Sequence, residues 1–176
     1  GYKSGTATLT GELLSKGTTN ADALQIAENI DLTGSLFASG FGYDGAFLSL
    51  TSYKDNSSTI LNLISDMILN STYPEDELES KKEQIINSLI SMQDEGSYLA
   101  ERIFKFIHYK DTPYQYDPDG YVESLKRINV RDLKTFSKKY YNSENIIIAV
   151  VGDFDEGNIL QTLEQRFANI SKEINF

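Results

Sequence analysis

Apolar residues recur along most of this chain at the three- and four-residue spacing that places them on one face of a helix. Capping residues are expected to start several of these helices, with Thr19 or Asn20 before the second, Asn56 or Ser57 before the third and Ser97 before the fifth. Gly17 and Gly96 are expected to end helices. The predicted helices cover residues 5–16, 57–69, 74–93, 121–127, 130–141 and 156–170, with one further helix that carries Ala23, Ile26, Ala27 and Ile30 and another that carries Leu99, Ile103, Phe106 and Ile107.

Two short runs have the pattern of strands rather than helices. They are SLFASGFG (35–42) and AFLSLTSY (46–53), and the Asp-Gly turn between them is a strong hairpin signal. A third apolar run, IIIAVV (146–151), lies in a further predicted strand at residues 145–151. We predict an α+β fold, a two-layer sandwich with an antiparallel-rich sheet. In it, Phe47, Leu48, Leu50 and residues 146–151 share one sheet covered by the helices at 57–69 and 74–93.

Length and charge narrow the classes of protein that fit this pattern. A chain of 176 residues is long enough for one core and too short for two, so residues 1–176 are predicted to form a single domain. The net charge of -10 repels polyanions unless positive charges gather on one face. Basic residues group along the sequence only as pairs such as Lys81-Lys82 and Lys138-Lys139, which argues against nucleic-acid binding. No apolar run approaches the ~20 residues that span a bilayer, so no membrane span is expected.

Three polar features are interpreted as structural. His108 lies near the end of a predicted helix, where an imidazole commonly interacts with the helix dipole or with water. The segment DPDGY (117–121) begins like a calcium loop but lacks the Gly and Glu spacing of an EF-hand, so it is interpreted as a turn. The acidic run EDELES (75–80) is expected to complement a helix dipole rather than to act as a catalytic carboxylate pair.

Three longer stretches, in this order and spacing, resemble a known family. They are GELLSKGT (11–18), ILNLISDMILNSTYPEDELESKKEQIINSL (60–89) and DTPYQYDPDGYVESLKRINVRDLKTFSKKYYNSENIIIAVVGDFD (111–155). Together they resemble the pitrilysin/insulinase family of zinc metallopeptidases, which includes the mitochondrial processing peptidases and the core subunits of the cytochrome bc1 complex. The resemblance covers nearly the whole chain, although no single stretch is specific.

The metal motif of that family is absent from this sequence. Active members carry His-x-x-Glu-His on their first helix, with two zinc-binding imidazoles and a Glu that acts as general base, and a distant Glu as third ligand. If Gly17-Thr18 fix the register, the resemblance places Thr8 and Glu12 at the two His positions and Gly11 at the base. The third-ligand position falls near Ser88. The chain has one His and no Cys, so we expect no catalytic residue and no metal site here.

The resemblance implies a role without catalysis. Members of the family are assembled from homologous halves that enclose a chamber, and only one half keeps the motif. This chain resembles the first part of the other half and is interpreted as an excerpt of a larger protein. The implied partners are a catalytic half that holds zinc, in the same chain or as a separate subunit, and an extended peptide substrate. Tyr114 and Tyr116 are candidate peptide contacts, although Tyr is equally common at the rim of a helix.

Two other functions remain open at this point. The chain could be a degenerate homologue that serves as a scaffold in a larger complex, or an unrelated α+β enzyme, although no nucleophile triad or phosphate loop supports the latter. The parent protein is expected to be a zinc metalloendopeptidase and this segment alone to be inactive. The compartment is unknown: relatives are periplasmic or cytoplasmic in bacteria and mitochondrial in eukaryotes. A half shaped to meet a homologue is also expected to expose apolar surface and to self-associate.

Overall fold

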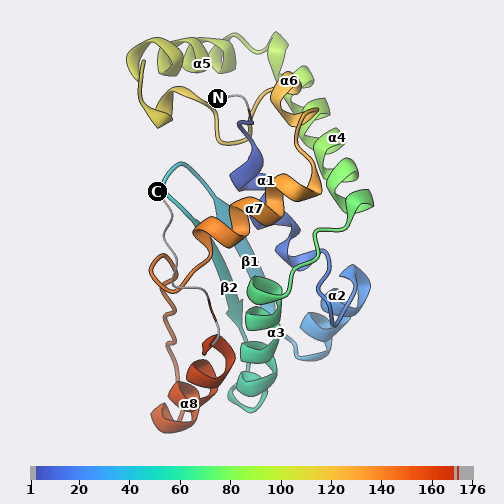
Figure 1. The fold of residues 1–176 in the computed structure, drawn as a ribbon, viewed down its shortest axis with the longest axis vertical. Helices are drawn as coiled ribbons and strands as arrows, with labels where there is room; N and C mark the ends of the chain where they lie inside the picture. Colours follow the sequence, from blue (N-terminus) through green and yellow to red (C-terminus); the bar gives the residue numbers. More distant parts are fainter. Residues whose placement is uncertain (1–2, 169, 171–176) are drawn as a thin grey trace.

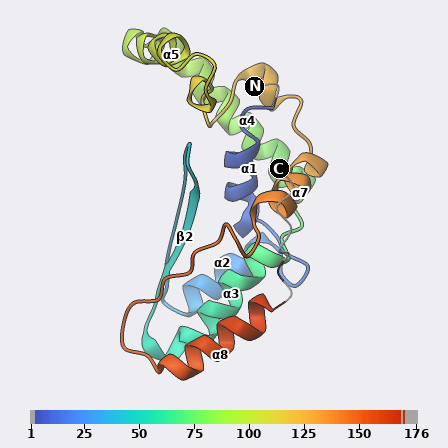
Figure 2. The same cartoon turned by 60° about the vertical axis from the view of Figure 1, so that its left-hand side comes forward.

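The computed structural model describes residues 3–168 and 170 and begins with a short buried helix. Helix α1 (Thr6–Glu12) continues as a 3-10 turn (Leu13–Ser15), as the spacing predicted. Leu9 and Leu13 are completely enclosed, because α1 is packed against α4, α7 and the first strand. Figures 1 and 2 show α1 at the centre of the molecule, with helices gathered at both ends.

Helix α2 (Ala23–Leu32) begins later than either predicted cap. Asp22, rather than Thr19 or Asn20, occupies the N-cap position: its carboxylate accepts from Gln25 N at 2.8 Å, and the Gln25 side chain accepts from Asp22 N at 3.0 Å. This reciprocal pair satisfies two backbone donors at once, so it fixes the helix start more strongly than a single hydroxyl or amide does.

The predicted hairpin is confirmed. Strands β1 (Leu36–Phe41) and β2 (Ala46–Thr51) pair antiparallel, with Leu36 opposite Thr51 and Phe41 opposite Ala46. The turn closes with a hydrogen bond from Gly42 N to Gly45 O of 3.0 Å. Figure 2 shows the hairpin on one side of α1, with its tip directed towards the end of the molecule that carries α5.

The prediction that residues 146–151 join this sheet is wrong. Among the described residues the sheet contains only β1 and β2, and residues 146–151 are extended without a strand partner. Ile147 and Val151 expose 94% and 96% of their surface. An apolar run of this length predicts burial but cannot show which strand lies beside it. The fold is nevertheless α+β as predicted.

Two long helices follow the hairpin, and only the first packs against it. Helix α3 (Ser57–Leu69), preceded by a 3-10 turn (Lys54–Asn56), contacts β2, and Asn56 stands at its N-cap position as predicted. Helix α4 (Glu75–Ser91) contacts α1 and α6, so the prediction that it covers the sheet is not met. Pro74 precedes α4 and three acidic residues occupy its first turn, which favours the helix dipole.

The boundary between α4 and α5 also differs from the prediction. Helix α4 passes into a 3-10 turn (Met92–Asp94), and Gly96 is the first residue of α5 (Gly96–His108) instead of ending the preceding helix. Glu95, and not Ser97, stands at the N-cap position. A 3-10 turn redirects the chain without a left-handed residue, so no glycine is needed at the end of α4.

The remaining helices follow the sequence prediction closely. A 3-10 turn (Pro113–Gln115) lies in the loop before α6 (Val122–Leu125). Helix α7 (Val130–Tyr140) starts at a capping box in which Asn129 and Asp132 exchange hydrogen bonds. Helix α8 (Glu156–Phe167) is capped by Asp155 and packs along α3; the predicted end at 170 includes a residue outside the described ones. Within the described residues, no helix is both long and apolar enough to cross a membrane.

The core is formed by helices on both sides of α1. Its members are Leu9, Leu13, Leu14, Ile26, Met67, Tyr73, Leu78, Leu89, Leu125, Ile128 and Leu133. Helix α5 contributes no fully buried residue, and its apolar side chains from Leu99 to Ile107 are 41–68% exposed. The expectation of exposed apolar surface is therefore met at α5, whereas self-association remains a prediction.

Leu133→Ala is expected to lower the free energy of unfolding by about 2–5 kcal/mol, because it leaves a cavity where α7 meets α1. Leu32→Ala removes the same atoms from a side chain that is 84% exposed, and should change stability by less than about 0.5 kcal/mol. Urea unfolding followed by circular dichroism measures both variants. Equal losses in the two would contradict the packing described for α7.

Candidate functional site

Thr8, Gly11 and Glu12 lie together on α1, although their side-chain environments differ. Thr8 is 5% exposed, and its hydroxyl donates a hydrogen bond of 2.8 Å to the carbonyl oxygen of Pro118. The hydroxyl is therefore occupied in joining α1 to the loop between α5 and α6. A single hydroxyl held in this way is a poor substitute for an imidazole as a zinc ligand.

Gly11 is covered by the ring of Phe41. A Cβ atom added at Gly11 would lie 1.9 Å from Phe41 Cε1 and 2.2 Å from Cδ1, far inside van der Waals contact. Phe41 is the last residue of β1, so the hairpin brings its ring down onto the buried side of α1. The space where a side chain at position 11 would start is already filled by an aromatic ring.

Glu12 is held by a lysine from α4. Lys81 Nζ lies 2.9 Å from Glu12 Oε2, and both side chains are less than one-third exposed. The oxygen is buried and the contact is an ion pair rather than an aligned hydrogen bond. An ammonium group thus stands beside the carboxylate that a metal ion would have to approach, and like charges repel.

Ser88 is joined to none of these three residues by a hydrogen bond in the described part of the chain. It is exposed on α4, where its carbonyl oxygen accepts a 2.9 Å hydrogen bond from Ser91 Oγ. It lies two turns beyond Lys81, which is about 10 Å along a helix. Among the described residues, no polar contact joins Ser88 to Thr8 or Glu12.

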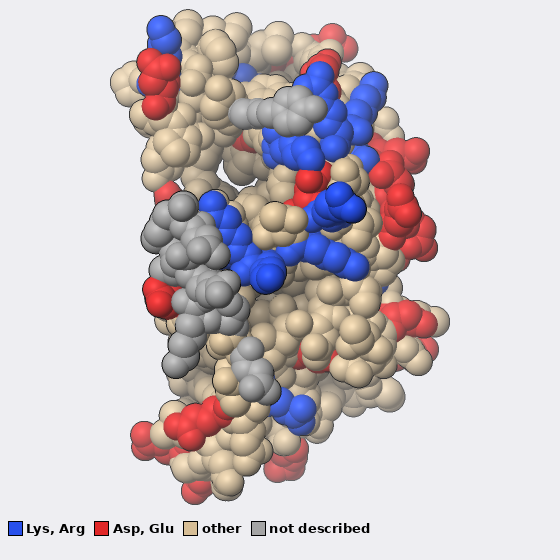
Figure 3. Space-filling model, in the orientation of Figure 1, with Lys and Arg blue, Asp and Glu red and all other residues tan. Residues whose placement is uncertain are grey.

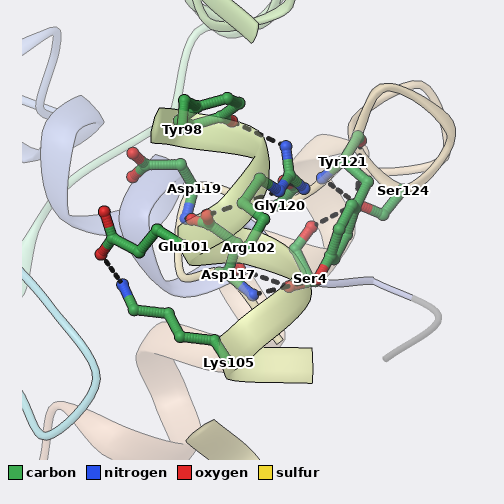
Figure 4. Close-up of polar contacts among 10 residues, drawn as sticks. All are labelled: Ser4, Tyr98, Glu101, Arg102, Lys105, Asp117, Asp119, Gly120, Tyr121 and Ser124. Atoms are coloured by element: carbon green, nitrogen blue, oxygen red, sulfur yellow. Dashed lines mark hydrogen bonds and ion pairs between the residues drawn. The ribbon is translucent and has the colours of Figure 1, made fainter. Parts of the chain in front are cut away.

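A second polar cluster surrounds Arg102 on α5 (Figure 4). Its Nη1 donates to the Tyr98 hydroxyl at 2.7 Å, and its guanidinium lies 4.4 Å from the centre of the Tyr121 ring. Nε is 4.0 Å from Asp117 Oδ2, so the arginine joins α5 to the loop that also receives the Thr8 hydrogen bond. This cluster anchors the otherwise exposed α5 to the body of the protein.

The turn at 117–120 places two carboxylates beside α1. Asp117 Oδ1 accepts from Asp119 N at 3.0 Å, as expected for a turn. Partial exclusion of water raises the pKa of Asp119 above its ordinary value and the neighbouring Asp117 adds to this, while Lys81 and Thr8 act in the opposite direction. Gly120 is required here, because its φ is 84° and a Cβ would lie 2.5 Å from the Ser4 carbonyl oxygen.

The described residues contain no group of three or more His, Cys, Asp or Glu side chains placed to hold a metal ion. His108 takes part in ring contacts instead: it stacks on Phe104 at 5.0 Å and meets the edge of Tyr109 at 4.9 Å. This agrees with its interpretation as a structural residue.

Tyr114 and Tyr116 lie in the loop after α5, and each is 40% exposed. The Tyr114 hydroxyl donates to Asp44 at the hairpin tip, and its ring lies 5.4 Å from that of Tyr43. The loop and the hairpin tip are thus joined by polar and aromatic contacts. A groove of about 750 Å³ is lined by the hairpin and by residues 146–149, and Phe41, Leu48 and Tyr141 are among its lining residues.

Sequence reasoning missed Phe41, Lys81 and Arg102. Gly11 did carry a signal, since a glycine inside a helix often marks a close approach by another side chain. Nothing in the sequence pattern identifies Phe41 as that side chain, or Lys81 as the partner of Glu12. The Tyr98-Arg102 pair has the four-residue spacing of helix neighbours, which is a weak signal.

Comparison with known proteins gives two family models that together match most of the chain. The family model described as Insulinase (Peptidase family M16) matches residues 1–116, and the model described as Peptidase M16 inactive domain matches residues 127–174. A crystal structure of a peptidase M16 inactive domain from Pseudomonas fluorescens superposes with a TM-score of 0.92 and 28% identity, covering 100% of this chain and 43% of that one.

Curated proteins give the same picture. An uncharacterized zinc protease of Rickettsia felis is 28% identical over 157 residues, which are 89% of this chain and 38% of the relative. The beta subunit of the mitochondrial-processing peptidase of Saccharomyces cerevisiae is 23% identical over 171 residues, 96% of this chain and 36% of that subunit. The chain thus spans less than two-fifths of the length of these relatives. The resemblance inferred from the sequence motifs is confirmed, and the chain belongs to peptidase family M16, the insulinase family, with the character of its inactive domain.

Proposed function

We propose that this chain is a non-catalytic domain of a zinc metallopeptidase, which forms part of the chamber wall and helps to bind peptide for a catalytic half. The observation that carries the proposal is the Phe41 ring over Gly11. The general base of the family motif would start from this position, and no side chain fits there unless the ring moves. The inactive-domain crystal structure that superposes on the whole chain also supports a non-catalytic role.

The other motif positions support it through their chemistry. We assign Thr8 and Glu12 to the two zinc-binding His positions and Ser88 to the region of the third ligand. Neutral imidazoles and a carboxylate are needed at these places. Thr8 is committed to Pro118, Glu12 is paired with Lys81, and Ser88 lies exposed on α4. These residues do not fit zinc, so the metal is assigned to the partner half and no catalytic step to this chain.

Peptide binding is proposed at the loop after α5. Tyr114 is fixed to the hairpin tip through a hydrogen bond to Asp44. Because its ring is already oriented, little further side-chain entropy would be lost when a peptide binds. The Tyr116 side chain is exposed and makes no hydrogen bond to another described residue. A rigid ring beside an available hydroxyl suits the mixed apolar and polar surface of an extended peptide.

The 176 residues are proposed to be the first part of a non-catalytic half. The relatives that support this are more than twice as long as the matched region. The catalytic half belongs either to the same polypeptide or to a separate subunit. The alternative role, a scaffold in a larger complex, differs in one measurable respect: a scaffold leaves peptide turnover by the catalytic half unchanged.

The purified chain is expected to retain less than one equivalent of zinc after dialysis and to leave a fluorogenic peptide intact. Hydrolysis should appear when a family member with an intact His-x-x-Glu-His motif is added, and should exceed that of the added subunit alone. Metal analysis and the peptide assay test this together. Stoichiometric zinc, or cleavage by the isolated chain that a chelator abolishes, would show that the motif has been placed wrongly.

Gly11→Ala is expected to destabilise the protein by about 1–3 kcal/mol, because the added Cβ meets the Phe41 ring. The sign of this change in stability distinguishes the two cases, since Ala at an open helix position would stabilise the protein by about 1 kcal/mol relative to Gly. In a Phe41→Ala background, the same substitution should no longer destabilise. Gly42→Ala, where nothing lies within 4 Å, serves as the control in urea unfolding.

Tyr116→Ala is expected to raise the KM of the assembled peptidase about three- to tenfold with little change in kcat, because an aromatic contact to bound peptide is lost. Tyr53→Ala removes a ring that is 75% exposed on another part of the surface and should leave KM unchanged. Steady-state kinetics with one peptide measures both variants. An unchanged KM for Tyr116→Ala would remove this residue from the binding surface.

A further inference from the structure

Positive charge is concentrated on one short part of this acidic protein. Residues 126–139 hold six of the sixteen basic residues and one of the twenty-six acidic ones. The rest of the chain carries ten basic against twenty-five acidic residues. Figure 3 shows the Lys and Arg side chains gathered over α6 and α7, with Asp and Glu along the neighbouring edge at α4.

The helix geometry turns this segment into a continuous basic face. Arg131, Lys134 and Lys138 follow one another at three- and four-residue spacing, and all three are exposed. Leu133 lies on the opposite side of α7, buried against the core. The basic face is completed by Lys126, Arg127 and Lys139. Along the sequence these residues form only isolated pairs, which is why the clustering could not be seen there.

Most of these charges have no ion-pair partner in the described part of the chain. Among the described residues, Lys126, Arg131, Lys134 and Lys138 form no ion pair with a carboxylate. Asp132, the one acidic residue of the segment, is engaged by Lys3 and by its own helix cap. Lys139 is 5.2 Å from the centre of the Tyr140 ring. Neighbouring cations on the basic face repel one another, and a bound anion would relieve this repulsion.

We propose that the basic face is a docking surface for an acidic segment of a partner polypeptide. The stripe from Arg131 to Lys138 is about 10 Å long at the rise of a helix, which matches a few carboxylates on one turn or strand of a partner. Carboxylates at that spacing would each meet a lysine or arginine. The surface lies outside the motif positions and the Tyr114–Tyr116 loop, so it is independent of the proposed function.

The size and surroundings of the basic face favour a short acidic segment over an extended polyanion. A nucleic acid or an anionic membrane is wider than one helix and would also meet the Asp and Glu side chains along the neighbouring edge at α4. Helix α7 has no apolar wedge for a bilayer either, because Leu133 is buried and the Phe136 ring lies against the Tyr140 ring in a tilted pair with centroids 4.5 Å apart. A peptide segment can contact the stripe alone.

The test measures binding of fluorescein-labelled decaglutamate by anisotropy, from about 50 mM to about 300 mM NaCl. The face variant is Arg131→Glu/Lys134→Glu/Lys138→Glu, and the matched control is Lys16→Glu/Lys110→Glu/Arg166→Glu, three exposed residues elsewhere with the same change in charge. Arg127 and Lys139 are left unchanged because each has other contacts. Vesicles of equal parts phosphatidylcholine and phosphatidylserine, and a short DNA duplex, are measured in parallel.

The wild-type chain is expected to bind decaglutamate with an affinity that falls as salt rises. The face variant should bind at least about tenfold more weakly, and the control within about twofold of wild type. The corresponding triple Gln variant gives an intermediate loss, and provides the test if the Glu variant has an altered circular dichroism spectrum. Absence of wild-type binding, or equal loss in the control, would overturn the proposal. So would tighter binding of vesicles or DNA through the same residues.

Discussion

The contact between the Phe41 ring and Gly11 is the constraint on which the rest of this structure depends. Helix α1 is surrounded by α4, α7 and β1, and the hairpin can approach it closely only where α1 carries a residue with a small side chain or none. Gly11 is that residue, and the ring of Phe41 fills the space beside it. The hairpin is too small to be stable alone, since two isolated strands are marginal in water. Its position is therefore fixed by packing on α1 at one end and by the Asp44–Tyr114 contact at its tip.

The same packing occupies the part of α1 where the family resemblance places a metal motif. A zinc site needs three ligands that converge on an open point. Here the corresponding part of α1 is closed by an aromatic ring, a hydroxyl bonded to Pro118 and a Glu12–Lys81 ion pair. Each contact links α1 to a different element, the hairpin, the loop before α6, and α4. Thr8, Gly11 and Glu12 thus serve to hold the domain together.

Burial at α1 contrasts with the surfaces that remain exposed. Helix α5 is joined to the body mainly through Arg102 and the loop after it, and leaves an apolar face in contact with water. Helix α7 buries its apolar side and presents lysines and arginines outward. The extended run at 146–151 is apolar and unpaired. A rigid centre with several uncovered faces of different chemistry suits a protein that works by contact with other chains.

The sequence by itself determined most of the local structure. Helical periodicity located α1, α3, α7 and α8, and the Asp-Gly turn located the hairpin, because spacing and turn chemistry act between residues close together in the chain. It also determined that the chain has one His and no Cys, since that depends on composition alone. Caps were less certain, as at Asp22 and Gly96, because several neighbouring residues can start or end a helix.

Only the tertiary structure decided which distant residues meet. The pairs Gly11 with Phe41, Glu12 with Lys81 and Arg102 with Asp117 join separate elements, and neither spacing nor residue type predicts them. The apolar run at 146–151 resembled a sheet strand because hydrophobicity records a preference for burial but not the neighbour that provides it. The basic face was likewise hidden, since it forms only when a helix places residues three and four apart on one side and packing fixes that side towards water.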